Sequence, residues 1–126
     1  MQFPEELYYT REHEWLKRIG EKEAVVGITD FAQSQLGDIV YVDIPSVGQR
    51  VEAGTVFGTI EAVKTVSDLY MPVTGTILEK NPVLESHPEK VNESPYEEGW
   101  MIRIEIEKPE QLETLLRAEA YRTLVG

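Results

Sequence analysis

Apolar and polar residues alternate along most of this chain, which is the pattern of half-buried β-strands. The clearest run is MIRIEIE at residues 101–107, where isoleucines alternate with charged residues. Other short apolar segments follow one another with turn residues between them, at residues 8–19, 23–29, 39–44, 49–54, 55–62, 65–72 and 75–80. The pattern therefore predicts a mainly β protein built from short strands.

Two of these segment pairs predict β-hairpins. GEK at residues 20–22 separates the first two segments, and Lys64 stands between the apolar runs at residues 55–62 and 65–72. The second hairpin would expose Lys64 at its tip. The segment IVYVDI at residues 39–44 alternates less cleanly, as in a strand buried on both faces.

Short helices are predicted at two internal positions. Asp30 and Gln33 have the spacing of a capping box, and a glycine at residue 37 can end the helix that they begin. Asn81 followed by proline is an N-cap and first-turn pair for a short helix or turn, which Pro88 would stop.

A C-terminal amphipathic helix is predicted after Pro109. Apolar residues recur there at steps of three and four positions, which places them on one face of a helix. They are Leu112, Leu115, Leu116, Ala120 and Leu124. We expect this stripe to pack on the rest of the protein.

Composition limits the function that these elements can serve. A chain of 126 residues fits a single domain. It has 23 acidic and 12 basic side chains, and a net charge of −11 disfavours binding to nucleic acid or to an anionic membrane surface. The absence of cysteine excludes disulfides and thiolate metal sites, and two isolated histidines give a metal site little support.

The first residues, MQFPEEL, lack the charge and apolar pattern of a signal peptide, and acidic Glu5 and Glu6 argue against a transit peptide. No apolar run approaches the roughly 20 residues that cross a bilayer. We therefore expect a cytoplasmic protein.

The residues around Lys64 add a candidate chemistry. Gly48 and Gly54 precede the lysine and Gly75 follows it, with alternating apolar residues between them. This spacing resembles the lipoyl/biotinyl carrier fold, a flattened β-barrel or sandwich in which a modified lysine stands on a protruding turn. An exposed turn would let a modifying enzyme reach the amine of Lys64.

Four separated motifs make the resemblance more specific. They are YTREHEW (9–15), VGITDFAQSQLGDIVYV (26–42), EAVKTVSDLYMPVTG (61–75) and VNESPYEEGWMIRI (91–104). In this order they resemble the H protein family of the glycine cleavage system. The resemblance implies one lipoyl-carrier domain over residues 1–126, with lipoate in amide linkage at Lys64. It also implies a carrier that is not itself an enzyme.

The resemblance also implies partners. The lipoyl arm would receive an aminomethyl group at the glycine decarboxylase (P protein) and deliver its carbon to tetrahydrofolate at the aminomethyltransferase (T protein). Dihydrolipoamide dehydrogenase (L protein) would then reoxidise the arm. A lipoylating enzyme is a fourth partner.

Five further residues gain candidate roles from the resemblance. Glu14 matches a family glutamate in a cleft that shelters the loaded arm, and Ile28 and Gln35 would complete that cleft. Glu61 matches a position read by the modifying enzyme. Asp68 could receive the charged aminomethyl group or be read by that enzyme, or it could be an ordinary acid at a strand edge. Phe31 stands where many members of the family have histidine, which would change how the cleft holds the arm.

Other interpretations remain. A biotin carrier usually has methionine on both sides of its lysine, whereas this chain has Val63 and Thr65. An H-like protein could instead relay lipoyl groups to other enzymes' carrier domains. A stand-alone enzyme using Glu14, His13 and Asp68 would lack a recognisable nucleophile, metal site or phosphate loop. A lone histidine beside a tryptophan is more typical of a hydrogen-bonded structural residue.

Overall fold

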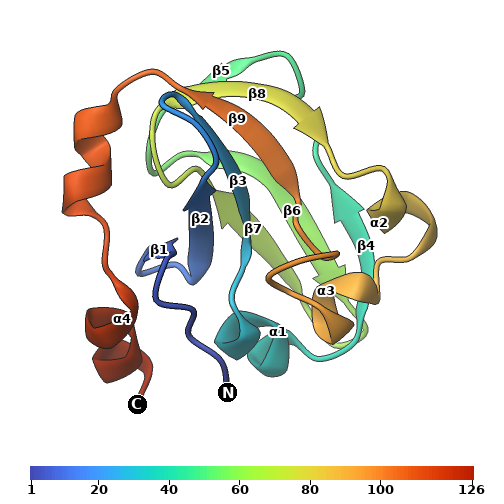
Figure 1. Cartoon of the computed structure of the whole chain (residues 1–126). Coiled ribbons are helices and arrows are strands. Elements are labelled where there is room, and N and C mark those ends of the chain that lie inside the picture. The colour runs from blue at the N-terminus through green and yellow to red at the C-terminus, as the bar shows by residue number, and fades with distance from the viewer.

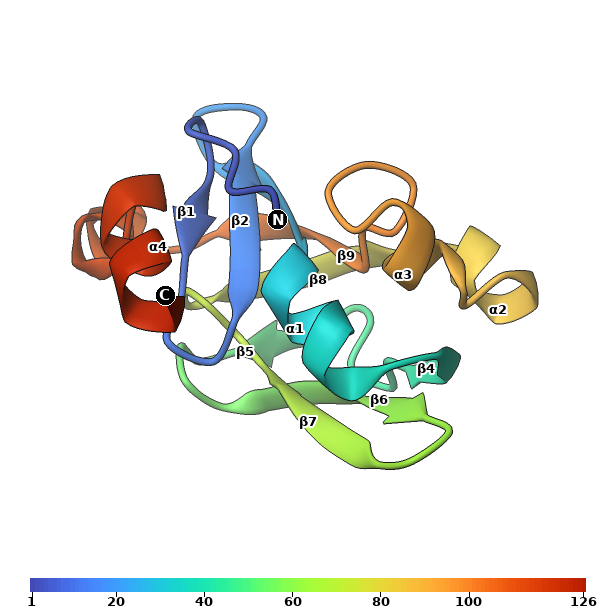
Figure 2. The same ribbon diagram turned by 90° about the horizontal axis from the view of Figure 1, so that it is seen from below.

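The computed structural model describes residues 1–126 as two antiparallel sheets that face each other (Figures 1 and 2). The larger sheet has the strand order β1 (Tyr8–Tyr9), β2 (Glu14–Arg18), β3 (Glu23–Ile28), β9 (Ile102–Ile106), β8 (Gly75–Lys80), β5 (Arg50–Val51). The smaller sheet has the order β4 (Ile39–Asp43), β6 (Val56–Ala62), β7 (Val66–Tyr70). The predicted mainly β, flattened barrel-sandwich class is confirmed.

The alternating segments place one face of each strand in a common core. On β9 the side chains of Ile102, Ile104 and Ile106 are no more than 1% exposed, whereas Glu105 between them is exposed. A cluster of 20 buried residues joins the inner faces of both sheets, from Leu16 on β2 to Leu69 on β7. Burial of this apolar surface holds the two sheets together.

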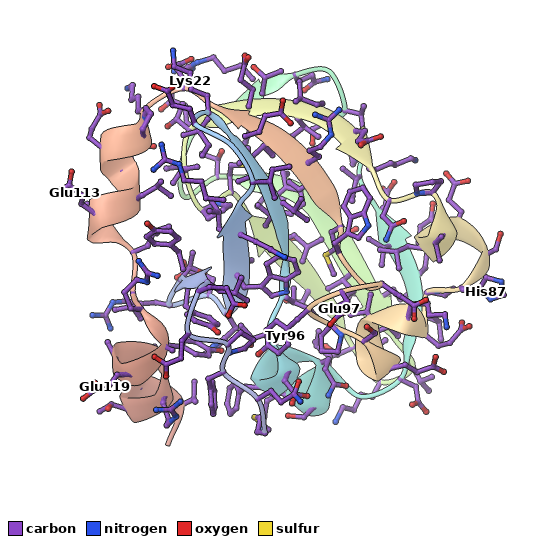
Figure 3. All side chains as sticks on the ribbon, in the orientation of Figure 1. Lys22, His87, Tyr96, Glu97, Glu113 and Glu119 are labelled. Atoms are coloured by element: carbon purple, nitrogen blue, oxygen red, sulfur yellow. The ribbon has the colours of Figure 1, made fainter.

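Both predicted hairpins are present. Strands β2 and β3 pair across the turn that contains Lys22, which is labelled in Figure 3 at the far end of the sheet from the C-terminal helix. Strands β6 and β7 pair across the turn that contains Lys64, and the N–H of Ala62 donates to the carbonyl of Thr65 at 2.7 Å to close it. Lys64 is therefore an exposed turn residue, as predicted.

Strand β4 differs from its prediction. The sequence suggested burial on both faces, but Val40 and Tyr41 are 46% and 52% exposed. The reason is position: β4 is an edge strand of a three-stranded sheet whose outer face meets solvent. Only Ile39 of this strand is buried in the core.

The internal helices form where the capping signals predicted them. Helix α1 spans Asp30–Leu36, but its N-cap is Thr29, whose hydroxyl accepts from the N–H of Ala32 at 3.1 Å. Asp30 instead accepts from the side chain of Gln33 at 2.8 Å. Helix α2 spans Val83–Ser86; its N-cap is Pro82 rather than the predicted Asn81, whose side chain accepts from the N–H of Val83 at 3.1 Å. The short helix α3 (Lys90–Glu93) was not predicted.

The C-terminal stripe does not form one helix. It divides into the 3₁₀ helix η1 (Pro109–Thr114) and the α-helix α4 (Ala118–Val125). Between them Leu116 is extended and exchanges two backbone hydrogen bonds with Tyr9, at 2.8 and 2.9 Å. The predicted C-terminal helix therefore exists but is shorter, and Tyr121 rather than Leu124 is its buried anchor.

Gly58 lies inside β6, where a side chain would have no room. A Cβ there would collide with the backbone carbonyl of Asp43 on β4. We expect Gly58→Ala to lower the free energy of unfolding by about 1–3 kcal/mol, because the two strands would have to separate. Gly20→Ala is the matched control, since its Cβ would meet nothing closer than 3.9 Å. Equal denaturant midpoints for the two variants would contradict this packing.

Candidate functional site

A cleft of about 280 Å³ opens between α1, β7 and the start of β2. Its wall combines apolar and acidic side chains from both sheets and from the helix. The lining residues are Glu12, His13, Glu14, Ile28, Phe31, Ala32, Gln35, Leu36, Ile60, Ser67, Asp68 and Leu69. The structure thus brings together Glu14, Ile28, Gln35 and Asp68, the cleft and recognition candidates that the family resemblance implies.

Lys64 lies near one end of this cleft. Its side chain passes over Gly37, where a Cβ would be 3.4 Å from the Lys64 Cε atom. Gly37 has φ +82° and ends α1, the helix that forms one wall of the cleft. The Lys64 amine is therefore carried on an exposed turn beside the C-terminal end of that wall.

Contacts around Gly37 hold this turn in place. The side chain of Asn92 on α3 donates to the Gly37 carbonyl at 2.9 Å and to the Gln33 side chain at 3.0 Å. From the other side, the N–H of Val63 donates to the carbonyl of Asp38 at 3.0 Å. The lysine turn is thus joined by a backbone hydrogen bond to the residue after Gly37, and Asn92 holds the end of α1; together these contacts position Lys64 relative to the cleft.

Glu14 is a carboxyl buried at the base of the cleft, only 2% exposed. Its oxygens accept from the Thr10 hydroxyl at 2.7 Å and from the N–H of Tyr70 at 3.1 Å. Removal from water raises the pKa of the Glu14 carboxyl to about 8, although both of these hydrogen bonds favour the ionised form. Both donors are neutral, so a cation that enters the cleft would favour the ionised carboxylate and gain it as an ionic partner.

The buried carboxyl of Glu14 should make stability depend on pH. The folded protein keeps this proton up to a pKa of about 8, while an unfolded glutamate loses it near its ordinary value of 4.5. Between these values the folded state binds more protons, so the free energy of unfolding should fall as pH rises, by up to about 1.4 kcal/mol per pH unit. Denaturant unfolding at several pH values measures this slope, and Glu14→Gln should remove that contribution. A Glu14→Gln slope equal to that of the unsubstituted protein would contradict the burial account.

Two other carboxylates stand at the mouth of the cleft. Asp68 on β7 and Glu12 before β2 are both exposed, and no lysine or arginine lines the cavity. With Glu14 beneath them, these groups favour a cationic occupant over an anionic one. The apolar walls from Ile28 and Leu69 would at the same time suit an aliphatic chain.

Glu61 lies outside the cleft. It faces outward on β6, paired with Tyr41 on β4 and with Val66 on β7. Glu61, Tyr41 and Val66 are exposed, and only Ala62 separates Glu61 from the turn that carries Lys64. Glu61 is thus accessible to an approaching protein but not to an occupant of the cleft.

His13 and Phe31 also line the cleft. Phe31 was expected there only as a departure from the family's histidine, and His13 was expected to be a structural residue. His13 makes the hydrogen bond expected of a structural histidine, between its Nδ1 and the Tyr121 hydroxyl at 2.9 Å, and its ring lies 5.0 Å from that of Phe31. Burial lowers the pKa of the His13 imidazole, against an opposing effect of Glu12. Phe31 shares a helix face with Gln35, four residues on, so helical spacing could have found it. His13 has φ 71°, a conformation that strand alternation does not reveal.

The described residues include no group of three or more histidine, cysteine or acidic side chains placed to hold a metal ion. None of the helices combines the length and the apolar character needed to cross a membrane.

The chain is similar to known proteins along its whole length. The sequence profile of a family described as Glycine cleavage H-protein matches residues 7–126. The glycine cleavage system H protein of Bacteroides thetaiotaomicron is 57% identical and that of Bacteroides fragilis 55% identical, each over 100% of this chain and 99% of the relative. A crystal structure of a glycine cleavage system H protein from Mycobacterium marinum superposes with a TM-score of 0.85 at 34% identity, covering 98% of this chain and 99% of that one.

Proposed function

Because the chain belongs to the glycine cleavage H-protein family, we propose that it is the lipoylated carrier of a glycine cleavage system, with lipoate attached at Lys64. The observation that carries the proposal is the position of Lys64, exposed on a hairpin turn beside an acidic cleft. An exposed primary amine can form an amide with a carboxylic acid such as lipoate. The cleft offers apolar walls for an aliphatic arm and carboxylates for a cation.

Bound lipoate would supply a disulfide that accepts the aminomethyl group of glycine and later releases it. The protein's own residues would bind and shelter the far end of that arm. Ile28, Leu36 and Leu69 would contact its apolar part, and Glu14 would pair with the cationic amine. Exclusion of water from the amine would slow its hydrolytic loss.

We further propose that residues 1–126 act as one carrier domain with no catalytic residue of its own. Its partners would be the P, T and L proteins and a lipoylating enzyme. The net charge of −11 supports docking to basic surfaces on such partners, with an association that weakens as salt increases. Glu61, exposed beside the Lys64 turn, is the residue that we propose the lipoylating enzyme reads.

The experiment that tests this function is glycine-dependent loading. The lipoylated protein is incubated with glycine and a P protein, and its intact mass is measured. We expect a mass increase on the lipoylated protein and none on the unmodified protein. A lipoylated protein that gains no mass would contradict the proposal, and transfer of its lipoyl group to another enzyme's carrier domain would then favour the relay role.

A further inference from the structure

Three side chains from distant segments form a hydrogen-bonded chain behind the cleft. His13 Nδ1 lies 2.9 Å from the hydroxyl of Tyr121 on α4, and that hydroxyl lies 2.7 Å from the hydroxyl of Thr29. Thr29 is the N-cap of α1. Thr29 and Tyr121 are each 0% exposed, so water does not compete for their hydrogens.

The donor and the acceptor in each of these hydrogen bonds follow from the partners that are present. The Thr29 oxygen already accepts from the N–H of Ala32, and its own hydrogen has one neighbour that can accept it, the Tyr121 hydroxyl. The Tyr121 hydrogen must then point to His13 Nδ1, because a buried hydroxyl hydrogen needs a partner. Nδ1 therefore acts as an acceptor, and the ring proton of His13 resides on Nε2.

Nε2 of His13 is not fully buried. It makes no hydrogen bond within the protein, and no buried side-chain nitrogen or oxygen is left without a partner. His13 is half-buried and lines the cleft, with its ring against Phe31. Its Nε2–H is thus available to an acceptor atom at the cleft wall.

We propose that Thr29 and Tyr121 fix His13 as the neutral Nε2–H tautomer, so that the cleft wall offers a hydrogen-bond donor without a second cation. The identity of the acceptor rests on the proposed function: it would be a sulfur or carbonyl oxygen of the lipoyl arm. Tyr121 is here a positioning residue, because it acts through His13.

The acidic groups around His13 explain why a neutral imidazole suits this site. The titratable groups that face His13 are Glu12, Glu14 and Asp68 in the cleft and Tyr121 behind it. An imidazolium among these carboxylates would compete with a cationic amine for them. Protonation of Nδ1 would also leave the Tyr121 hydrogen without an acceptor. The hydrogen bonds from Thr29 through Tyr121 to His13 thus keep His13 neutral and leave the acidic groups free to pair with a cationic occupant of the cleft.

Helix α4 gains a role in the site from this arrangement. The Tyr121 ring stacks on Tyr9 at a centroid distance of 4.7 Å and meets Phe3 edge-on at 5.8 Å. These contacts hold the hydroxyl in position between His13 and Thr29. The C-terminal helix therefore controls the protonation of a cleft residue that lies 108 positions earlier in the chain.

The test is NMR of the unmodified protein labelled with ¹⁵N at its histidines, which separates this inference from lipoylation. Near neutral pH we expect His13 to show a protonated Nε2 and an unprotonated Nδ1. His87 is an internal reference, because it lies on the exposed loop after α2, away from α4 (Figure 3). A protonated Nδ1 of His13 in the unsubstituted protein would overturn the proposal without any variant.

Tyr121→Phe tests the donor directly. Loss of the hydroxyl should raise the pKa of His13 and mix its two tautomers, because the neutral Nε2–H form loses its partner. Tyr9→Phe is the matched control: it removes a neighbouring buried hydroxyl that donates to the Pro4 carbonyl, and should leave the His13 titration unchanged. The same His13 titration in Tyr121→Phe as in the unsubstituted protein would also overturn the proposal.

The lipoylated protein gives the functional readout. Once loaded from glycine, Tyr121→Phe should lose its aminomethyl group severalfold faster than Tyr9→Phe in mildly acidic buffer, and at the same rate in alkaline buffer, where His13 is neutral in both. Equal rates of aminomethyl loss from the two variants in acidic buffer would show that His13 does not bind the lipoyl arm. Failure to load either variant would count against the proposed function and leave the tautomer assignment standing.

Discussion

A Lys64→Arg protein should carry no lipoyl group and should support no detectable glycine cleavage. A guanidinium keeps the charge and length of the side chain but is not the primary amine that forms the lipoyl amide. The substitution should be silent for stability, since Lys64 is an exposed turn residue. Intact mass and glycine-dependent release of carbon dioxide measure the two losses.

Lys22→Arg is the matched control for that experiment. Lys22 is also exposed, and it also lies in a hairpin turn, between β2 and β3 (Figure 3). The Lys22→Arg protein should be lipoylated at Lys64 and remain active. Equal activity of the two variants would show that the turn lysine at residue 64 is not the attachment point.

Glu14→Ala should shed the aminomethyl group of a loaded arm at least about tenfold faster, with lipoylation at Lys64 intact. A hydrogen bond to a charged group contributes roughly 1.5–3 kcal/mol, and 1.4 kcal/mol corresponds to a factor of ten. Glu14 is the buried partner in the cleft, so its loss also admits water. The decay of the mass increment after removal of free glycine measures the rate.

Two substitutions separate charge from cavity effects in that measurement. Glu14→Gln keeps the volume but cannot ionise to pair with the cationic amine, so it should also accelerate the loss. Glu105→Gln removes an exposed carboxylate from β9, remote from the cleft lining, and should leave the decay unchanged. Decay in Glu14→Ala at the rate of the unsubstituted protein would remove Glu14 from the sheltering role.

Local sequence patterns predict the parts of this fold that depend on near neighbours. The alternation on β9, the hairpin at Lys64 and the capping signals before α1 all act within a few residues, and each gives the expected element. The cleft residues came from the family resemblance instead. No local pattern indicates that Glu14 and Asp68, 54 positions apart in the numbering, line one cavity.

The features that the sequence did not predict depend on contacts between distant segments. Val40 and Tyr41 of β4 are exposed because this strand is at a sheet edge, which strand composition does not encode. The C-terminal stripe breaks at Leu116 because Tyr9 pairs with it. His13 enters the cleft wall in a backbone conformation fixed by the whole fold.

The central claim is that Lys64 carries lipoate, and the intact mass of the protein purified from its native cells tests it most directly. We expect the mass to exceed that of the bare chain by one lipoyl group, and we expect peptide fragmentation to place that group on Lys64. A chain with no adduct, or an adduct that persists in Lys64→Arg, would contradict the account.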